Sequence, residues 1–86
     1  MIILSDKKLH EYKSEVVYNT RDNRAVDIKI HFDPFAGNPK LDVHIYGNLS
    51  AEETDEVIVS IAKNLKYRMA YEIDDSTDLN IIFVEE

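Results

Sequence analysis

Six carboxylates near the end of this 86-residue chain are the side chains with the clearest capacity for binding. The last fifteen residues contain no Lys or Arg to neutralise them. A surface of this kind repels nucleic-acid phosphates and anionic membranes and attracts basic partners. The pattern therefore predicts a partner-binding set, which consists of Glu72, Asp74, Asp75, Asp78, Glu85 and Glu86.

The same segment has part of the spacing of a calcium-binding loop. Asp74, Ser76 and Asp78 fall at the first, third and fifth positions of a twelve-residue loop, and Glu85 falls at the twelfth. Oxygen ligands at these positions suit a hard cation. The sixth position, however, is Leu79, where such loops need glycine for a sharp turn. The sequence therefore favours a solvated acidic turn over a calcium site.

A second candidate for metal binding is a set of polar side chains on an expected hairpin. His31, Asp42 and His44 alternate with apolar residues, and the strand pairing described below makes them neighbours. Two imidazoles and a carboxylate can bind a transition metal. Lys29 is expected opposite His44, where its ammonium group would repel a cation. We therefore interpret these residues as an ordinary exposed sheet face, and we assign no metal ligand and no cofactor.

Enzymatic catalysis has little support in the sequence. The chain has no cysteine and no Gly-x-Ser-x-Gly motif, and its glycines at positions 37 and 47 cannot form a phosphate-binding or dinucleotide-binding loop. A chain of this size also offers little concave surface for a substrate. We predict a non-enzymatic protein without catalytic residues.

Length, composition and charge describe the scaffold that must position these side chains. With 44% hydrophobic and 31% charged residues, the chain has the composition of one compact domain, residues 1–86. The net charge of −7 arises in the second half, because residues 1–43 carry seven acids and seven bases. No apolar run has the length of a secretory signal or a membrane span, which predicts a soluble, cytoplasmic protein.

One long helix is predicted for residues 51–68. Ser50 and Glu53 have the spacing of a capping box, in which each side chain bonds the backbone of the other. Acidic residues lie in the first turns and basic residues in the last, as the helix dipole favours. An apolar stripe follows at helical spacing and consists of Ile58, Ile61, Ala62, Leu65 and Met69.

Alternating apolar and polar residues predict a β-hairpin of strands 25–33 and 41–47, joined by a segment rich in turn formers. Pairing Phe32 with Leu41 makes one face of the hairpin apolar and the other polar, as a half-buried antiparallel sheet requires. The same register pairs Ile30 with Val43, Ile28 with Ile45, His31 with Asp42 and Lys29 with His44.

The residues before the hairpin allow two arrangements. In the first, Ser5 caps a short N-terminal helix that carries Tyr12. Residues 15–20 then form a strand that directs Val16 and Tyr18 toward the core. A three-residue turn at 21–23 leads into the hairpin, with Asn23 in the left-handed conformation.

In the second arrangement the first helix extends to Tyr18 and residues 1–4 form a strand, which gives a ferredoxin-like βαββαβ fold. We prefer the first arrangement. It gives a small two-layer α+β fold in which the hairpin, strand 79–84 and strand 15–20 form an antiparallel sheet packed by helix 51–68.

Strand 79–84 has an unusual composition for the end of a small sheet. Ile81, Ile82, Phe83 and Val84 are apolar at consecutive positions, so both faces of the strand are apolar. Either the strand is covered on both sides or its outer face meets another molecule. We therefore expect that a homodimer can form through residues 79–84.

Taken together, these features predict an acidic binding or regulatory protein that occupies a basic surface of a partner, such as a nucleic-acid-binding protein. It would contact neither nucleic acid nor membrane directly. Carboxylates on a rigid edge can imitate phosphates, and small acidic inhibitors of phages and mobile elements have this size and charge. Two alternatives stay open: a divalent-metal-binding module and a self-associating structural subunit.

Overall fold

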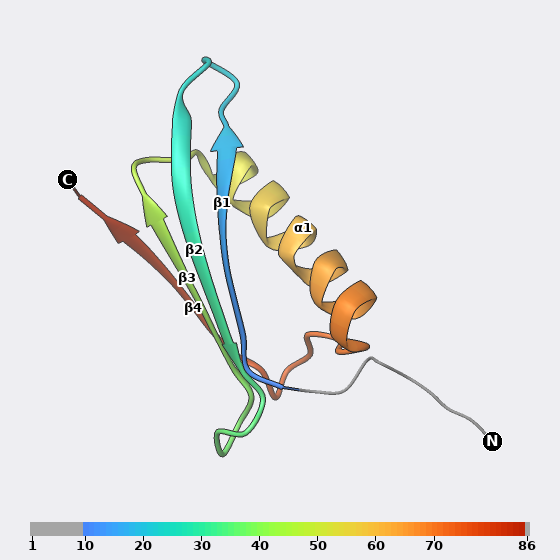
Figure 1. Ribbon diagram of the computed structural model, residues 1–86. Coiled ribbons are helices and arrows are strands. Elements are labelled where there is room, and N and C mark those ends of the chain that lie inside the picture. The colour runs from blue at the N-terminus through green and yellow to red at the C-terminus, as the bar shows by residue number, and fades with distance from the viewer. Residues whose placement is uncertain (1–9, 86) are drawn as a thin grey trace.

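The computed structural model describes residues 10–85, which form one four-stranded sheet with one helix packed on one face (Figure 1). Along the chain the elements are β1 (Tyr12–Asn19), β2 (Ala25–Asp33), β3 (Lys40–Tyr46), α1 (Ala51–Met69) and β4 (Asp78–Val84). The strands lie in the sheet in the order β1-β2-β3-β4. This arrangement confirms the predicted two-layer α+β fold.

The β2–β3 hairpin has the register predicted from the sequence. Phe32 lies opposite Leu41 and His31 lies opposite Asp42. Phe32 and Leu41 are fully buried, whereas the polar residues that alternate with the apolar ones along both strands lie on the other face. The apolar–polar alternation therefore sets the register, since a shift by one residue would turn every buried side chain into solvent.

Strand β1 and the turn that follows it confirm the strand and the three-residue turn of the first arrangement, although the strand begins earlier than predicted, at Tyr12. Thr20 N donates to the backbone oxygen of Arg24 at 2.8 Å, which closes a three-residue turn, and Asn23 adopts a φ of 64°. Val16 pairs with Ile28 and shares its face of the sheet, but it stays 41% exposed because β1 is an edge strand.

The longer first helix of the second arrangement is wrong over the described residues. Tyr12 to Tyr18 are extended and pair with β2, so Tyr12 belongs to a strand and not to a helix. The ferredoxin-like alternative is accordingly not confirmed. The short helix capped by Ser5 and the strand at residues 1–4 lie outside the described residues.

Helix α1 forms where predicted and ends one residue later. Both halves of the capping box are present, since Glu53 N donates to Ser50 Oγ at 3.1 Å and Ser50 N donates to Glu53 Oε1 at 3.0 Å. The buried row is Val57, Ile61, Leu65 and Met69. The predicted stripe placed Ile58 and Ala62 in the core, but they lie on one flank of this row and are only half-buried.

Strand β4 corrects the prediction of an antiparallel sheet, because it pairs parallel to β3 with Lys40 opposite Asp78. The sheet is therefore mixed. The physical reason is the crossover. Helix α1 has 19 residues, and at about 1.5 Å per residue it carries the chain back past the length of β3. Strand β4 thus begins beside the start of β3 and runs in the same direction.

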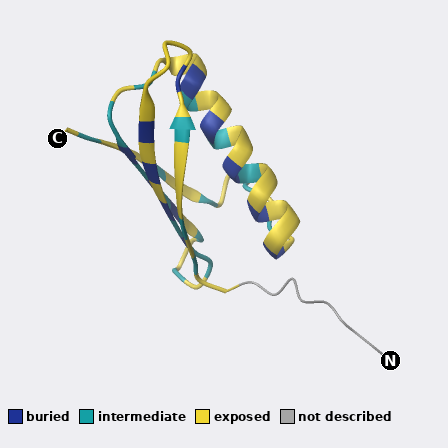
Figure 2. Cartoon of the chain, turned by 45° about the horizontal axis from the view of Figure 1, so that its top comes forward, coloured by how far each residue is buried: buried dark blue, intermediate teal, exposed yellow. Residues whose placement is uncertain are grey.

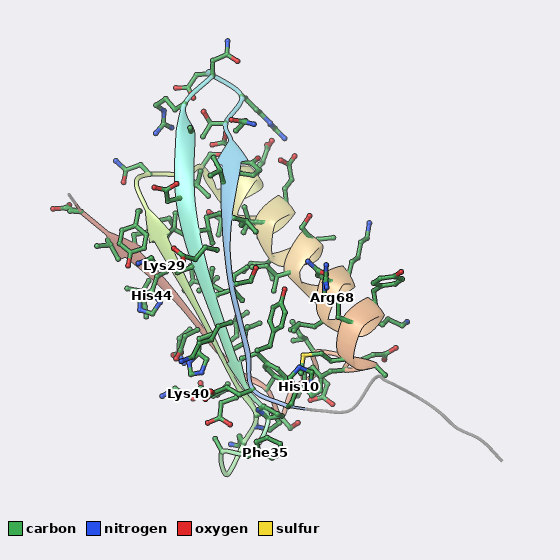
Figure 3. All side chains as sticks on the ribbon, viewed as in Figure 1. His10, Lys29, Phe35, Lys40, His44 and Arg68 are labelled. Carbon is green, nitrogen blue, oxygen red and sulfur yellow. The ribbon has the colours of Figure 1, made fainter. Side chains whose placement is uncertain are left out.

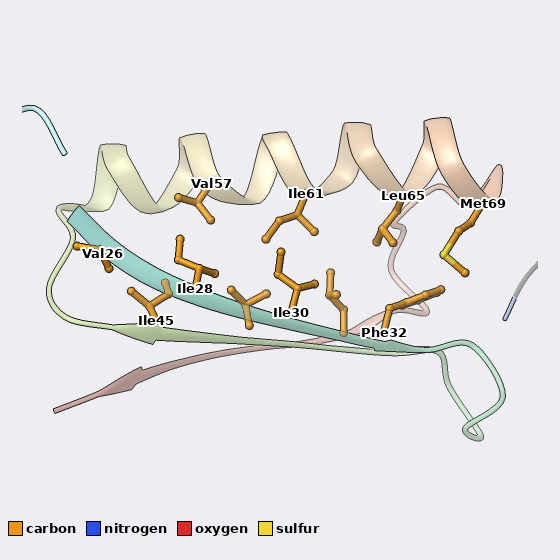
Figure 4. Close-up of a cluster of buried hydrophobic side chains, with 11 residues drawn as sticks. Val26, Ile28, Ile30, Phe32, Ile45, Val57, Ile61, Leu65 and Met69 are labelled. Carbon is orange, nitrogen blue, oxygen red and sulfur yellow. The ribbon is translucent and has the colours of Figure 1, made fainter. Parts of the chain in front are cut away.

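The core lies between α1 and the two central strands (Figure 4). Its members are Val26, Ile28, Ile30, Phe32, Leu41, Val43, Ile45, Val57, Ile61, Leu65 and Met69. Strand β4 supplies none of them, and in Figure 2 it is coloured as exposed and intermediate. Within the part of the chain that the structure describes, no helix has the length and apolarity needed to cross a membrane.

Candidate protein-binding surface

The segment between α1 and β4 carries three of the six predicted binding residues, a fourth begins β4, and the segment is tied to the rest of the fold. Asp78 N donates to the backbone oxygen of Pro39 at 2.7 Å, which holds the segment against the β2–β3 turn. The Tyr71 ring lies 4.6 Å from the Phe32 ring, centroid to centroid, and the Tyr71 hydroxyl bonds the Thr77 hydroxyl. These contacts hold the segment that carries the acidic residues against the core.

Asp74 organises the turn at the centre of this segment. Its Oδ1 accepts from Ser76 N at 2.8 Å and from Ser76 Oγ at 2.6 Å, and its backbone oxygen accepts from Thr77 N at 3.0 Å. The bonds from Ser76 hold the pKa of Asp74 below its ordinary value, because they stabilise the charged carboxylate. Asp74 is therefore ionised at neutral pH and part of a defined turn.

The six predicted binding residues do not form one continuous surface. Glu72 is paired with Lys66, whose Nζ lies 2.9 Å from Glu72 Oε1. Glu85 follows the far end of β4, which is about 20 Å long at the usual rise of a strand. Glu86 lies outside the described residues. The set is thereby divided into a group at one end of β4 and Glu85 at the other.

Asp74, Asp75 and Asp78 are the members that lie close together in the chain and stay exposed. In residues 10–85, none of the three forms an ion pair with Lys or Arg. We call these three residues the acidic turn. The length of β4 also rules out the calcium-binding loop, because it holds Asp74 and Glu85 too far apart to bind one ion.

Two acidic residues of the helix, in contrast, form ion pairs with the first half of the chain. Arg21, in the β1–β2 turn, reaches Glu52 and Glu56 with 2.7 Å contacts to each. Glu56 also accepts from the Tyr18 hydroxyl at 2.7 Å. Both donors lower the pKa of Glu56 by stabilising its charged form. Glu52 and Glu56 therefore share the single positive charge of Arg21.

The sheet face opposite α1 carries charged and polar side chains from all four strands. His31, Asp42 and Asn80 follow one another in register, and the Asn80 amide donates to Asp42 at 3.1 Å. Lys29 lies beside His44 on this face (Figure 3), with its ammonium 5.3 Å from the Tyr46 ring centroid. Such cross-strand pairs stabilise an exposed sheet face.

The three side chains considered for metal binding lie on this face, and two of them lie beside other polar groups. His31 Nε2 lies 3.0 Å from Glu11 Oε2, and Asp42 is bound by Asn80. Across residues 10–85, no group of three or more His, Cys, Asp or Glu side chains has an arrangement that could hold a metal ion.

Strand β4 exposes apolar side chains on both faces. Leu79, Ile81 and Phe83 lie beside the buried residues of β3 but stay 37%, 37% and 46% exposed. Ile82, on the other face, is 40% exposed. The exposure has a simple cause, because α1 covers the central strands and β4 lies at the edge of the sheet (Figure 1).

Phe35 is a surface residue that the sequence analysis missed. It is 72% exposed at the tip of the β2–β3 turn (Figure 3), and this turn contacts the acidic segment through Pro39. Exposed aromatic side chains are enriched in protein interfaces. The signal in the sequence was a large apolar residue in a turn otherwise made of small and turn-forming residues.

The described fold defines a small α+β protein with a mixed sheet, one exposed apolar edge strand and an acidic turn beside it. No protein-family model, curated protein or solved structure matches the chain.

Proposed function

We propose that this chain is a non-enzymatic acidic protein that binds a basic surface of a partner protein. The observation that carries the proposal is the acidic turn. Asp74, Asp75 and Asp78 are exposed, held by a turn anchored on the core, and without an ion pair among the described residues. Fixed carboxylates lose little freedom on binding, and they attract cationic partners over several ångströms.

The finer proposal is an inhibitor that acts as a nucleic-acid mimic in the cytoplasm. In this role the carboxylates take the place of phosphates on the surface of a nucleic-acid-binding protein. The size and net charge of −7 resemble those of small acidic inhibitors from phages and mobile elements. This support is an analogy with a class of proteins.

Affinity capture from native cells with the tagged protein tests the proposal. The test variant is Asp74→Asn, Asp75→Asn, Asp78→Asn, in which the amide oxygen introduced at position 74 still accepts from Ser76. A matched control removes the same charge from the open sheet face and the helix, with Glu15→Gln, Asp27→Asn, Asp55→Asn. We expect to capture a partner protein that binds the control variant and does not bind the test variant. High salt should release this partner.

Equal recovery by the two variants would show that net charge, and not the acidic turn, governs binding. Recovery that does not change with salt would contradict an electrostatic interface, since screening weakens exposed charge pairs. Mimicry has a further requirement, which is that nucleic acid competes with this protein for the captured partner.

Self-association through residues 79–84 is a second candidate function, favoured by the exposed apolar strand β4. A homodimer would pair β4 of one copy with β4 of another and cover Ile81, Ile82 and Phe83. Sedimentation at increasing protein concentration tests it. A monomer at the highest concentration would remove this candidate.

A further inference from the structure

Strand β4 presents an unpaired backbone edge to solvent in the described part of the chain. Among residues 10–85 it is the last strand of the sheet, and its only strand neighbour is β3. Native proteins usually protect such edges with charged residues or proline inside the strand. The other edge strand, β1, follows this rule with Lys13 and Glu15, whereas Leu79 to Val84 contains no charged residue and no proline.

The charges near β4 lie at its two ends instead. Asp75 and Asp78 precede or begin the strand, and Glu85 follows it. The result is an apolar edge bounded on both sides by exposed carboxylates. Charges in these flanking positions disfavour pairing with a strand of like charge and favour a strand of opposite charge.

We propose that β4 binds an extended segment of a partner protein, which adds to the sheet as a fifth strand and carries Lys or Arg at both ends of a short apolar stretch. This inference rests on the proposed function and specifies the partner for it. Backbone bonds to the β4 edge supply affinity, and the flanking charges supply selectivity, as in other cases of strand addition.

A second copy of this chain is a poorer occupant for electrostatic reasons. A closed two-fold pair places the two β4 strands antiparallel. With Ile81 at the centre, Asp78 lies opposite Val84 of the second copy and Thr77 lies opposite its Glu85. Asp75 and Asp78 of one copy then lie close to Glu85 of the other at both ends of the interface. A basic segment replaces these repulsive contacts with attractive ones.

The side chains of β4 also specify the pattern of the bound segment. Leu79, Ile81 and Phe83 share the face that α1 covers on the central strands. Alternate apolar residues in the added strand would cover these three side chains and extend the core. On the other face, Asn80 and Ile82 accept polar or small residues. The expected segment is therefore basic at its ends and alternates apolar with polar residues between them.

Fluorescence anisotropy with labelled synthetic peptides tests this proposal on the full chain. The first peptide is Lys-Lys-Val-Thr-Val-Thr-Val-Lys-Lys. The second has Glu in place of each Lys, and the third has Pro in place of the central Val. Proline removes a backbone donor and cannot continue a strand. We expect the first peptide to bind at least tenfold more tightly than either of the others, with amide NMR shifts concentrated in residues 78–85.

Two protein variants localise the site. Asp75→Asn, Asp78→Asn, Glu85→Gln should weaken binding of the first peptide at least fivefold. The matched control Glu15→Gln, Asp27→Asn, Asp55→Asn should bind it like the unmodified chain. Ile82→Lys, which places a cation on the exposed face of β4, should weaken it at least fivefold while leaving the helix signal in circular dichroism unchanged.

Each other outcome overturns a distinct claim. If the Pro peptide binds as well as the first, strand addition is wrong, while an acidic site for basic partners stands. If the Glu peptide binds as well as the first, β4 is a strand-binding edge without charge selection, and the electrostatic basis of the proposed function fails with it. If no peptide binds and sedimentation shows a dimer, the edge is occupied by a second copy and the proposed segment is wrong. If no peptide binds a monomeric protein, the strand-addition proposal is overturned, and affinity capture alone decides the proposed function.

Discussion

Truncation of two isoleucines on adjacent strands measures how far β4 is covered in solution. Ile45 on β3 and Ile81 on β4 lie on the same face of the sheet, toward α1. Ile45 is 0% exposed and Ile81 is 37% exposed. Because the residue type, secondary structure and face are the same, the two Ile→Ala substitutions differ mainly in what surrounds each side chain.

The structure gives different costs for the two substitutions. Ile45→Ala leaves a cavity in a closed core, and we expect it to lower the free energy of unfolding by about 2–5 kcal/mol. Ile81→Ala removes three carbons that are about three-fifths shielded and leaves a space open to water. At roughly 0.8 kcal/mol per buried carbon, its cost is about 1.5 kcal/mol.

Urea denaturation followed by circular dichroism measures both losses. An 86-residue domain has a total stability of roughly 4–13 kcal/mol, so Ile45→Ala is close to the limit of folding, and Ile45→Val with Ile81→Val forms a milder second pair. Equal losses for Ile45 and Ile81 would refute an uncovered β4. A cost for Ile81 that grows with protein concentration would show a second copy covering the strand.

Three further predictions concern the scaffold. The backbone bonds from Ser50 and Arg21 hold the pKa of Glu53 below its ordinary value, so its contribution to stability is present at neutral pH and is lost as pH falls through that lowered pKa. Urea midpoints between about pH 7 and pH 3 should therefore fall less steeply in Glu53→Gln than in the unmodified chain, and parallel curves would contradict this assignment. Gly47 has a φ of 143°, and an added Cβ would meet Val26 Cγ1 at 3.4 Å. Gly47→Ala should therefore lower the free energy of unfolding by about 1–3 kcal/mol in the same assay. The control Gly37→Ala, where an added Cβ has nothing within 4 Å, should change it little. Ala70 ends the helix in the left-handed conformation with a φ of 52°, so Ala70→Gly should raise the melting temperature and stabilise the fold by roughly 1 kcal/mol. A lower melting temperature would show that Ala70 stabilises the folded state in another way.

The accessible negative charge is smaller than the composition suggests. Arg21 forms ion pairs with both Glu52 and Glu56 through space, and Lys66 pairs with Glu72. Neither pairing follows from distance along the chain, since Arg21 lies 31 residues from Glu52. The candidate interface is therefore defined by the carboxylates that the fold leaves unpaired, and not by the total of acidic residues.

Sequence patterns alone predict the features that depend on neighbouring residues in the chain. The capping box of Ser50 and Glu53, the pairing of Phe32 with Leu41 and the left-handed conformation of Asn23 are set by periodicity of three or four residues, by alternation of two, and by turn chemistry. These signals act over a few residues and are complete within the segments that carry them.

Which of these segments meet, and in which direction they run, depends on the packing of the whole fold. The crossover through α1 makes β4 parallel to β3, and that direction places Asp78 and Glu85 at opposite ends of one exposed strand. The face of α1 that lies against the sheet buries Val57 and leaves Ile58 on the flank. These outcomes depend on how whole elements pack, because burial and charge pairing are set by distance in space and not by spacing in the chain.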